Sequence, residues 1–266
     1  MEKLFDSHAH YYDERFIAEG EGAIPLLEQL FASNVGGILN VGTSLENAKQ
    51  VLEQAAAFPF MYAALGIHPS DGQAYEKAEL AVEQLAELIG TAEQRRERKI
   101  VALGEIGLDY HYPDTDKPHQ AKMLALQLSL ARELDLPVII HDRDAHGDCF
   151  DAVCACPGIR GVFHSYSGSA EMARDLVRRG WYISFSGVAT FKNAPRVREA
   201  IAAVPIERIL IETDAPYLAP HPHRGKLNHS GYLCYTAAAV GEVKGLSSDE
   251  VAWHTARNAA ELFGLS

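Results

Sequence analysis

The stretch Lys3-Leu4-Phe5-Asp6-Ser7-His8-Ala9-His10 is an apolar run that ends in two histidines separated by one residue. Successive side chains of a strand point to opposite faces, so a strand over Leu4–His10 places His8 and His10 on the same side. Two imidazoles at the end of a buried strand can chelate a metal ion. An isolated His-x-His is more often a pair of ordinary histidines, so the other ligands must come from elsewhere in the chain.

The same pattern, a short apolar run followed by an amphipathic stretch, recurs along the 266 residues. Eight runs predict strands: Leu4–His10, Gly37–Gly42, Met61–His68, Ile100–Asp109, Pro137–Arg143, Val162–Ser167, Tyr182–Gly187 and Ile209–Asp214. Nine stretches predict helices: Ile24–Ser33, Leu45–Ala57, Leu80–Ile89, Gln120–Leu134, Ala145–Ala155, Ala170–Arg179, Ala194–Val204, Tyr235–Lys244 and Ser248–Phe263. Ser44 and Ser169 are predicted helix N-caps, and Gly180 a helix end.

Eight strand-then-helix units with near-continuously apolar strands predict a parallel sheet covered by helices. The number of units favours an α/β fold of the (β/α)8 TIM barrel type over an open sheet. Because the sequence contains no linker, repeat or low-complexity segment, we predict a single domain over residues 1–266.

The composition narrows the classes of function. The net charge of −12 argues against a protein that coats long duplex nucleic acid, although it allows an enzyme that acts on one phosphate at a strand end. No apolar stretch is long enough to span a membrane, and no signal peptide is recognised, so we expect a cytoplasmic protein without membrane contact. The four cysteines do not form a disulfide framework, and no obligate protein partner is evident.

Side chains that can bind metal follow the predicted strands at their carboxyl ends, where TIM barrels carry their chemistry. They are His8, His10, His68, Glu105, His141, His164 and Asp214. Any one of them could instead cap backbone groups or hydrogen-bond a loop. Burying so many imidazole and carboxylate groups at one end of the barrel is costly unless cations hold them together. The set of residues therefore favours a binuclear metal site at the C-terminal face.

Five segments closely resemble signatures of the TatD family of metal-dependent deoxyribonucleases, which are amidohydrolase-like barrels. They are Asp6–His10 (DSHAH), Gly104–Tyr110 (GEIGLDY), Pro137–Ala145 (PVIIHDRDA), Phe163–Gly168 (FHSYSG) and Glu212–Pro220 (ETDAPYLAP). They occur in the family's order, and the resemblance covers effectively the whole chain from residue 5.

The resemblance implies two divalent metal ions, either Mg, Mn or Zn. It assigns the first to His8, His10, Glu105 and Asp214, and the second to Glu105, His141 and His164, with Glu105 bridging. His68 matches a family position near the substrate phosphate, although its chemistry equally allows a role in orienting a metal ligand.

One segment departs from the family pattern. The family usually carries Gly-Lys-x-Asn-x-Pro after the eighth strand, whereas this chain reads Arg224-Gly225-Lys226-Leu227-Asn228-His229-Ser230-Gly231, without the proline. Arg224, Lys226 and His229 could still contact phosphates. The altered backbone leaves the shape of the substrate groove open.

From these residues we expect hydrolysis of phosphodiester bonds in DNA by a metal-activated water. Glu105 and Asp214 are the catalytic candidates, and Asp214 would orient or deprotonate the water. His68, Arg143, Arg224 and Lys226 are the candidate substrate contacts. The negative net charge favours single-stranded or frayed ends, and therefore an exonuclease.

Two alternatives stay open. The same barrel could hydrolyse a C–N or ester bond, as related amidohydrolases do, although Arg143, Lys192, Arg224 and Lys226 favour a phosphate-bearing substrate. A non-catalytic metal-binding protein is the third possibility, and the intact set of ligands argues against it.

Overall fold

Eight parallel strands form one sheet in the computed structural model, which describes residues 3–265, and their order follows the sequence from β1 to β8. Residues 1, 2 and 266 of the predicted 1–266 domain lie outside the described part. The strands are β1 Leu4–Ala9, β2 Val35–Gly42, β3 Met61–Leu65, β4 Ile100–Asp109, β5 Val138–Arg143, β6 Gly161–Phe163, β7 Tyr182–Phe185 and β8 Ile209–Ile211.

The barrel closes between β1 and the segment after β8. The backbone N–H of Asp214 donates to His8 O at 2.9 Å, and that of His10 donates to Ala215 O at 2.7 Å. The predicted (β/α)8 TIM barrel is confirmed. Because the closing bonds involve the segments that carry His8, His10 and Asp214, closure itself brings these three side chains to one place.

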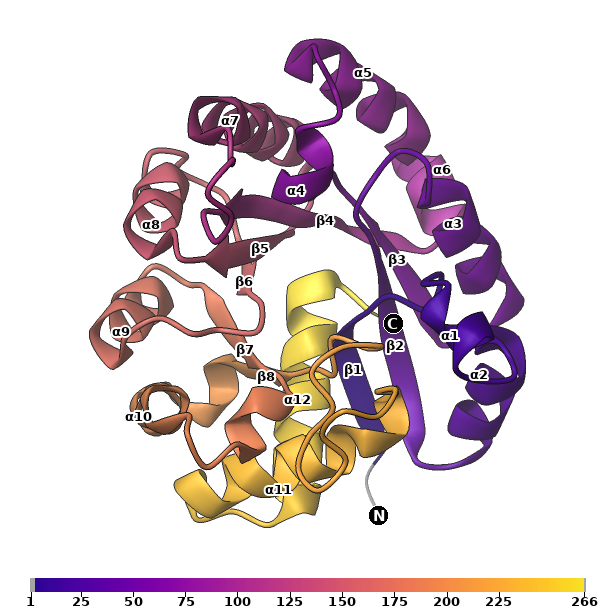
Figure 1. Ribbon diagram of the computed structural model, residues 1–266, viewed down its shortest axis with the longest axis vertical. Coiled ribbons are helices and arrows are strands. Elements are labelled where there is room, and N and C mark those ends of the chain that lie inside the picture. Colours follow the sequence, from indigo (N-terminus) through magenta and orange to yellow (C-terminus); the bar gives the residue numbers. More distant parts are fainter. Residues whose placement is uncertain (1–2, 266) are drawn as a thin grey trace.

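Helices surround the strands (Figure 1). They are α1 Arg15–Ala18, α2 Ala23–Ala32, α3 Ala48–Ala57, α4 Pro69–Gly72, α5 Ala78–Ile89, α6 Ala92–Glu97, α7 Lys117–Leu134, α8 His146–Cys154, α9 Ala170–Arg178, α10 Pro195–Ala203, α11 Leu233–Lys244 and α12 Ser248–Phe263. Short 3-10 helices are η1 Gly187–Thr190, η2 Ile206–Arg208 and η3 Ser230–Tyr232. Within residues 3–265, no helix is long and apolar enough to cross a membrane.

The predicted caps had different outcomes. Ser169 is confirmed as the N-cap of α9, since its hydroxyl accepts from the Met172 N–H at 3.2 Å. The cap predicted at Ser44 is wrong, because α3 begins three residues later, after Asn47. The Ser44 hydroxyl instead lies 3.4 Å from the Asn47 nitrogen in the preceding turn.

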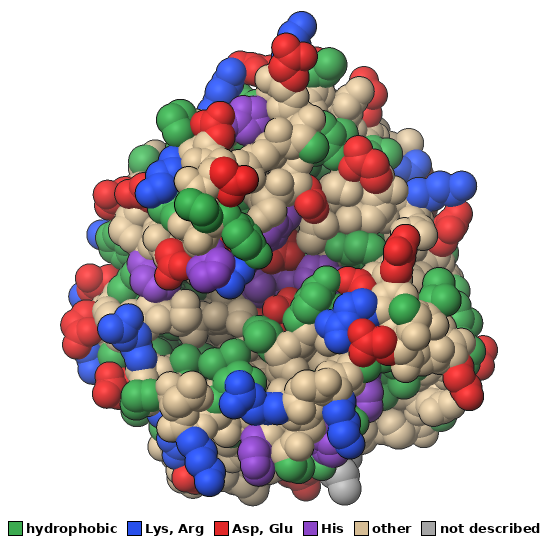
Figure 2. All heavy atoms as spheres, in the orientation of Figure 1, with side chains coloured by type: hydrophobic (Ala, Val, Ile, Leu, Met, Phe, Trp, Pro, Cys, Tyr) green, Lys and Arg blue, Asp and Glu red, His purple; other side chains and the backbone are tan. Residues whose placement is uncertain are grey.

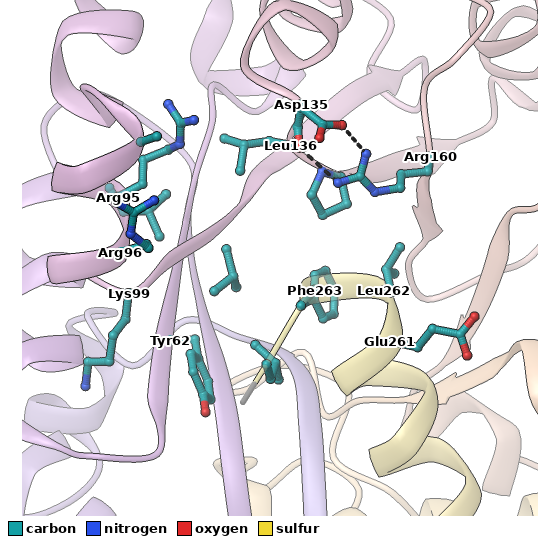
Figure 3. A pocket seen from close by; sticks show the side chains of 16 residues that line it. Tyr62, Arg95, Arg96, Lys99, Asp135, Leu136, Arg160, Glu261, Leu262 and Phe263 are labelled. Atoms are coloured by element: carbon teal, nitrogen blue, oxygen red, sulfur yellow. Dashed lines mark hydrogen bonds and ion pairs between the residues drawn. The ribbon is translucent and has the colours of Figure 1, made fainter.

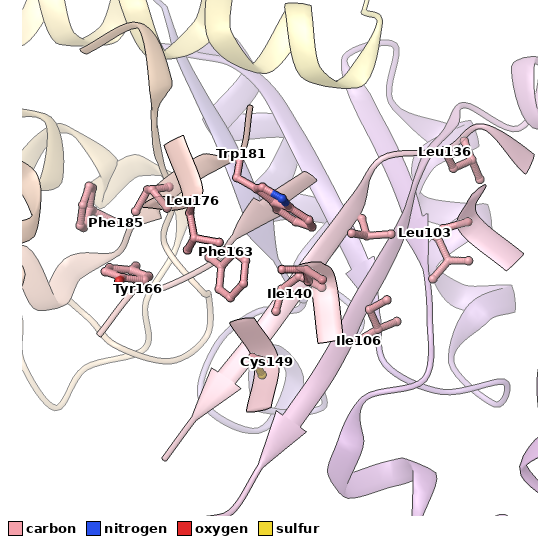
Figure 4. Close-up of a cluster of buried hydrophobic side chains, with 14 of the residues drawn as sticks. Leu103, Ile106, Leu136, Ile140, Cys149, Phe163, Tyr166, Leu176, Trp181 and Phe185 are labelled. Carbon is pink, nitrogen blue, oxygen red and sulfur yellow. The ribbon is translucent and has the colours of Figure 1, made fainter. Parts of the chain in front are cut away.

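The apolar side chains form layers on both sides of the strands. The larger layer fills the space between the strands and the outer helices, where Phe163 packs edge-on against Trp181 (Figure 4). A second layer fills the barrel interior with side chains such as Leu39, Val41 and Ile139. Leu262 and Phe263 at the end of α12 join that interior layer, so the last helix helps to plug the barrel at the ends where the strands begin.

Candidate metal centre

The predicted ligands converge at the carboxyl ends of the strands. His8 lies on β1 with His10 directly after it, Glu105 lies on β4 and His141 on β5, and the remaining two follow β6 and β8. His164 and Asp214 therefore stand in loops, one and three residues beyond strands that are shorter than predicted. Figure 2 shows histidine and acidic side chains on the floor of a hollow in this face, and that hollow has a volume of ≈ 450 Å³.

One oxygen of Glu105 faces the first group of predicted ligands. Its Oε2 atom lies 3.3 Å from His8 Nε2 and 3.5 Å from His10 Nε2. The two imidazole nitrogens are 3.1 Å apart, and Asp214 Oδ1 lies 3.3 Å from His10 Nε2 and 3.8 Å from His8 Nε2. Four donor atoms from three segments of the chain thus surround one point.

The other oxygen of Glu105 faces the second group. Its Oε1 atom lies 3.0 Å from His141 Nδ1 and 3.1 Å from His164 Nε2, and these nitrogens are 3.2 Å apart. Glu105 is buried. Each of its oxygens therefore belongs to a different set of candidate ligands, which is the arrangement that a bridging carboxylate requires.

The spacing and chemistry of these atoms fit divalent cations. Donors bound to one tetrahedral metal ion at ~2.0–2.1 Å lie about 3.3 Å from each other, close to the separations measured within both groups. The donor atoms of His8, His10 and Glu105 lie within 4.8 Å of one another, as do those of Glu105, His141 and His164, so each set could hold an ion. Asp214 forms a further such set with His8 and His164. Imidazole and carboxylate together suit Zn and Mn better than Ca.

The outward nitrogens of the histidines are fixed by hydrogen-bond acceptors. His10 Nδ1 lies 2.7 Å from Val41 O, His141 Nε2 lies 3.2 Å from Asp109 Oδ2, and His164 Nδ1 lies 3.2 Å from Glu212 Oε1. Such partners set the tautomer, so that the inward nitrogen presents a lone pair. His8 is the exception, since its Nδ1 atom has no hydrogen-bond partner among the described residues.

Asp109 and Glu212 were not among the predicted site residues. Both stand inside motifs that resemble the family, four residues after Glu105 and two before Asp214 respectively. Their places inside these motifs were the sequence signal that could have identified them. The buried Glu212 also accepts from the Ser165 N–H at 2.7 Å, which holds the loop that carries His164.

The pKa values of the clustered side chains are shifted because carboxylates and imidazoles lie close together and away from water. Burial opposes ionisation of Glu105, but the charges of His8 and His164 outweigh it and hold the pKa of this carboxyl well below its usual range. Burial lowers the pKa of His10, yet the Asp214 hydrogen bond and the Glu105 charge raise it to about 9 overall. The carboxylates are thus ionised at neutral pH, and cations can replace the protons on the imidazoles.

His68 lies at the edge of the cluster and differs from the other histidines. Its Nδ1 atom accepts from the Ser70 N–H at 3.1 Å as the N-cap of α4, so the proton of the neutral ring lies on Nε2. Nε2 is 3.6 Å from Glu105 Oε1. Burial and the charge of His141 lower the pKa of His68 to about 3. His68 therefore presents a neutral N–H donor to the hollow.

Local backbone features allow the strands to bring these side chains together. Gly107 has a φ of +152°, and a Cβ atom on it would lie 1.9 Å from His141 O, so only glycine allows β5 to approach β4 so closely. Asp214 has a φ of +58°, which is unusual for a residue other than glycine. Such backbone conformations are concentrated at functional sites.

The predicted substrate contacts fall into two sets. His68 and Arg143 line the hollow above the cluster. Within the described part of the chain, Arg224 and Lys226 line neither this hollow nor the cavity of ≈ 390 Å³ beside it. The Arg224 guanidinium lies over the Phe191 ring at 4.2 Å, and both cations are exposed. The structure therefore brings only the first two close to the candidate ligands.

In the loop after β8, Ser230 stands where the family pattern has a proline. Its backbone and side chain both form hydrogen bonds. The Ser230 N–H donates to the Tyr11 hydroxyl at 2.9 Å, and the Ser230 hydroxyl donates to Asp6 Oδ2 at 2.7 Å. A proline could make neither bond. Asn228, which is buried, donates to Thr213 O and Tyr217 O and so fixes the start of the same loop.

A larger cavity of ≈ 540 Å³ lies at the opposite end of the barrel (Figure 3). It is lined by Phe263 at the end of α12, Arg95 on α6 and Arg160, which forms an ion pair with Asp135. The predicted metal ligands lie at the other end. In TIM barrels this end contributes stability, so size alone does not indicate the site.

Comparison with known proteins agrees with this picture. The sequence matches the family described as "TatD related DNase" over residues 5–264. It is 37% identical to "Uncharacterized metal-dependent hydrolase YabD" of Bacillus subtilis, over 99% of this chain and 100% of the relative. It is 35% identical to "Uncharacterized metal-dependent hydrolase TatD" of Mycobacterium tuberculosis, over 98% of each. The crystal structure of the TatD homologue YjjV from Escherichia coli superposes with a TM-score of 0.88 at 32% identity, covering 99% of this chain and 98% of that one.

Proposed function

The chain belongs to the TatD family of metal-dependent hydrolases, and from this premise we propose that it hydrolyses phosphodiester bonds of DNA with two divalent cations. The observation that carries the proposal is the placement of Glu105, whose two oxygens face separate groups of imidazole and carboxylate ligands. Two cations a few ångströms apart are typical of enzymes that transfer phosphoryl groups, because both the attacking and the leaving oxygen need charge stabilisation.

When bound, the cations would polarise a phosphate oxygen and lower the pKa of a water molecule. His8, His10, Glu105 and Asp214 would hold one, and Glu105, His141 and His164 the other. Asp214 is ionised at neutral pH, because the His10 hydrogen bond and the charges of the surrounding histidines together outweigh burial and lower its pKa. Its carboxylate can therefore accept a hydrogen bond from the attacking water and orient it.

Two further side chains would bind the phosphate. His68 stays neutral at physiological pH, and so donates its Nε2 hydrogen to a phosphate oxygen rather than acting as a general acid. Arg143 lines both cavities and can supply a planar pair of donors to the same group. Together they favour a phosphodiester over an amide, which carries no comparable negative charge.

Single-stranded ends are the substrate that the proposal favours. The chain carries a net charge of −12, and Asp13 and Asp71 line the hollow beside the candidate ligands. These charges oppose the approach of a long duplex with its dense phosphates. A short single strand can place one phosphate at the cations while keeping most of the others away, which suits an exonuclease.

The test is hydrolysis of an end-labelled single-stranded oligonucleotide by metal-stripped protein, with Mg, Mn or Zn added back. We expect metal-dependent shortening from one end, which Glu105→Ala abolishes and Glu133→Ala, a change of an exposed carboxylate on α7, leaves intact. If the wild type stays inactive with every metal while hydrolysing an ester or amide, the proposal fails and the amidohydrolase alternative replaces it. Cleavage by Glu105→Ala at the wild-type rate would also contradict it.

A further inference from the structure

Two tyrosines stand on the rim of the hollow with much of each ring open to solvent. Tyr112 follows β4 and is 52% exposed, and Tyr217 follows β8 and is 44% exposed. Both line the hollow that contains Glu105 and His141. Since β4 and β8 lie on opposite sides of an eight-stranded barrel, the rings approach the candidate cations from different directions.

Contacts with neighbouring side chains hold each ring in place without covering it. The Tyr217 hydroxyl donates to Asp13 Oδ2 at 2.6 Å, and the Arg15 guanidinium lies 5.5 Å from the ring centroid. The Arg143 guanidinium lies 5.7 Å from the Tyr112 ring, and His111 packs edge-on against that ring at 5.2 Å. A ring that is already oriented loses little conformational entropy when a planar group stacks on it.

The tyrosines also occupy distinct places relative to the two cavities. Tyr217 and Arg143 line both the ≈ 450 Å³ hollow and the adjoining ≈ 390 Å³ cavity, whereas Tyr112 lines the first alone. The cavities share His141, His164 and Asp214, so they meet at the candidate cations. A phosphate bound there would have room for a nucleoside on either side.

We propose that Tyr112 and Tyr217 are stacking sites for unpaired bases that flank the scissile phosphate. The inference rests on the proposed function and narrows it to substrates whose bases are unstacked, namely single strands and frayed ends. Every base has a flat π-face, so such sites accept all sequences. A base inside a duplex already stacks on its neighbours and pairs with its partner, and is therefore not available to the tyrosines.

A purely structural role for the tyrosines makes a different prediction. Tyr217 could serve only to tie the loop after β8 to Asp13 through its hydroxyl. Tyr217→Phe removes that hydrogen bond and keeps the ring, whereas Tyr217→Leu removes both. Tyr112→Phe and Tyr112→Leu form the matching pair. Tyr235→Leu removes another exposed ring that lies outside the lining of both cavities, and serves as the control.

The experiment compares kcat and KM on two oligonucleotides that share one backbone, one with normal bases and one abasic at the terminal two positions. For the wild type, we expect removal of the bases to raise KM by roughly 5- to 150-fold per lost stack, with kcat nearly unchanged. Tyr112→Leu and Tyr217→Leu should raise KM similarly on the normal strand but leave the abasic strand unaffected. Tyr112→Phe and Tyr235→Leu should match the wild type on both. Tyr217→Phe keeps the ring but loses the Asp13 hydrogen bond, so it should raise KM on the normal strand much less than Tyr217→Leu.

Four outcomes overturn the inference. If the leucine variants cleave the normal strand as the wild type does, the rings do not bind bases. If they lose activity equally on the normal and abasic strands, or if Tyr217→Phe loses as much as Tyr217→Leu, the tyrosines act through the structure of the loops. A wild type that cleaves neither strand with any metal would overturn the proposed function itself, and the inference with it.

Discussion

At the scale of single residues, Glu105 connects the two groups of candidate ligands. Its side chain is buried among imidazoles, and its two oxygens face different pairs of nitrogens. A buried carboxylate at this position needs positive charge around it, which either protonated histidines or bound cations can supply. Competition between protons and cations should therefore govern the chemistry of the site.

We predict that the apparent affinity for divalent cations rises with pH from 7 to 9. The pKa of His10 is raised to about 9, chiefly because the Asp214 hydrogen bond and the Glu105 charge outweigh burial, so at neutral pH this ring holds a proton that the metal must displace. The affinity should increase about tenfold per pH unit for each proton displaced. Chelator competition from pH 7 to 9.5 measures it, and a flat profile would contradict the prediction.

Asp109 should control metal binding through His141. Its carboxylate accepts from His141 Nε2 at 3.2 Å, so it fixes the nitrogen that faces Glu105. We expect Asp109→Asn to weaken binding of one of the two cations by roughly 10- to 100-fold. Isothermal titration with Zn or Mn on stripped protein measures the change. Asp148→Asn, which alters a carboxylate that accepts from the Tyr110 hydroxyl, should bind both cations normally.

The convergence of the six candidate ligands could be predicted from the sequence, because parallel strands end at the same face and each of these residues follows or ends an apolar run. Their partners could not be found in this way. Asp109 accepts a hydrogen bond from His141, and Glu212 pairs with His164. These contacts depend on side-chain rotamers and on the register between neighbouring strands, which the sequence does not give. The sequence also could not show that the Arg224 guanidinium lies over the Phe191 ring.

At the scale of elements, apolar periodicity predicted each long helix and failed on the short ones. α4 spans a single turn from Pro69 to Gly72, and α6 has no buried residue, so neither shows an apolar face. The capping box formed by Thr91 and Gln94 was a sequence signal for α6. Strands β6 and β8 end earlier than predicted, because the predictions included the polar residues His164–Ser167 and Glu212–Asp214, which the structure places in loops.

The loop after β8 depends on Ser230, which bonds to Tyr11 and Asp6. We expect Ser230→Ala to lower the free energy of unfolding by about 1–3 kcal/mol, because the buried Asp6 carboxylate and Tyr11 hydroxyl lose a partner. Ser230→Pro should cost more, since it also removes the N–H donor. Urea unfolding of stripped protein measures both. Ser248→Ala at the exposed start of α12 is the control, and equal stability of all four proteins would contradict the prediction.

At the scale of the whole molecule, the two ends of the barrel have separate roles. The ligands, the hollow and the rim tyrosines lie where the strands end, whereas α12 plugs the interior where they begin. This separation is general in TIM barrels, in which loops at one face vary with the chemistry and the other face contributes stability. The larger cavity beside Phe263 therefore lies far from the candidate chemistry.

Truncation of Phe263, at the end of α12, should reduce the stability of the protein without affecting the candidate metal centre. Phe263 is buried against the interior layer, so we expect Phe263→Ala to lower the free energy of unfolding by about 3–5 kcal/mol. At a temperature where the variant is folded, its metal stoichiometry should equal that of the wild type. Denaturant unfolding and metal analysis measure the two quantities. Loss of metal from the folded variant would show that the two ends are coupled.

If Glu105 bridges two divalent cations, anomalous diffraction will locate both of them beside its carboxylate. Crystals equilibrated with Mn²⁺ should show two anomalous peaks, one between Glu105 and the pair His8 and His10, the other between Glu105 and the pair His141 and His164. Glu105→Ala crystals should lose at least one of them. A single peak in the wild type, or two peaks that do not contact Glu105, would contradict the account.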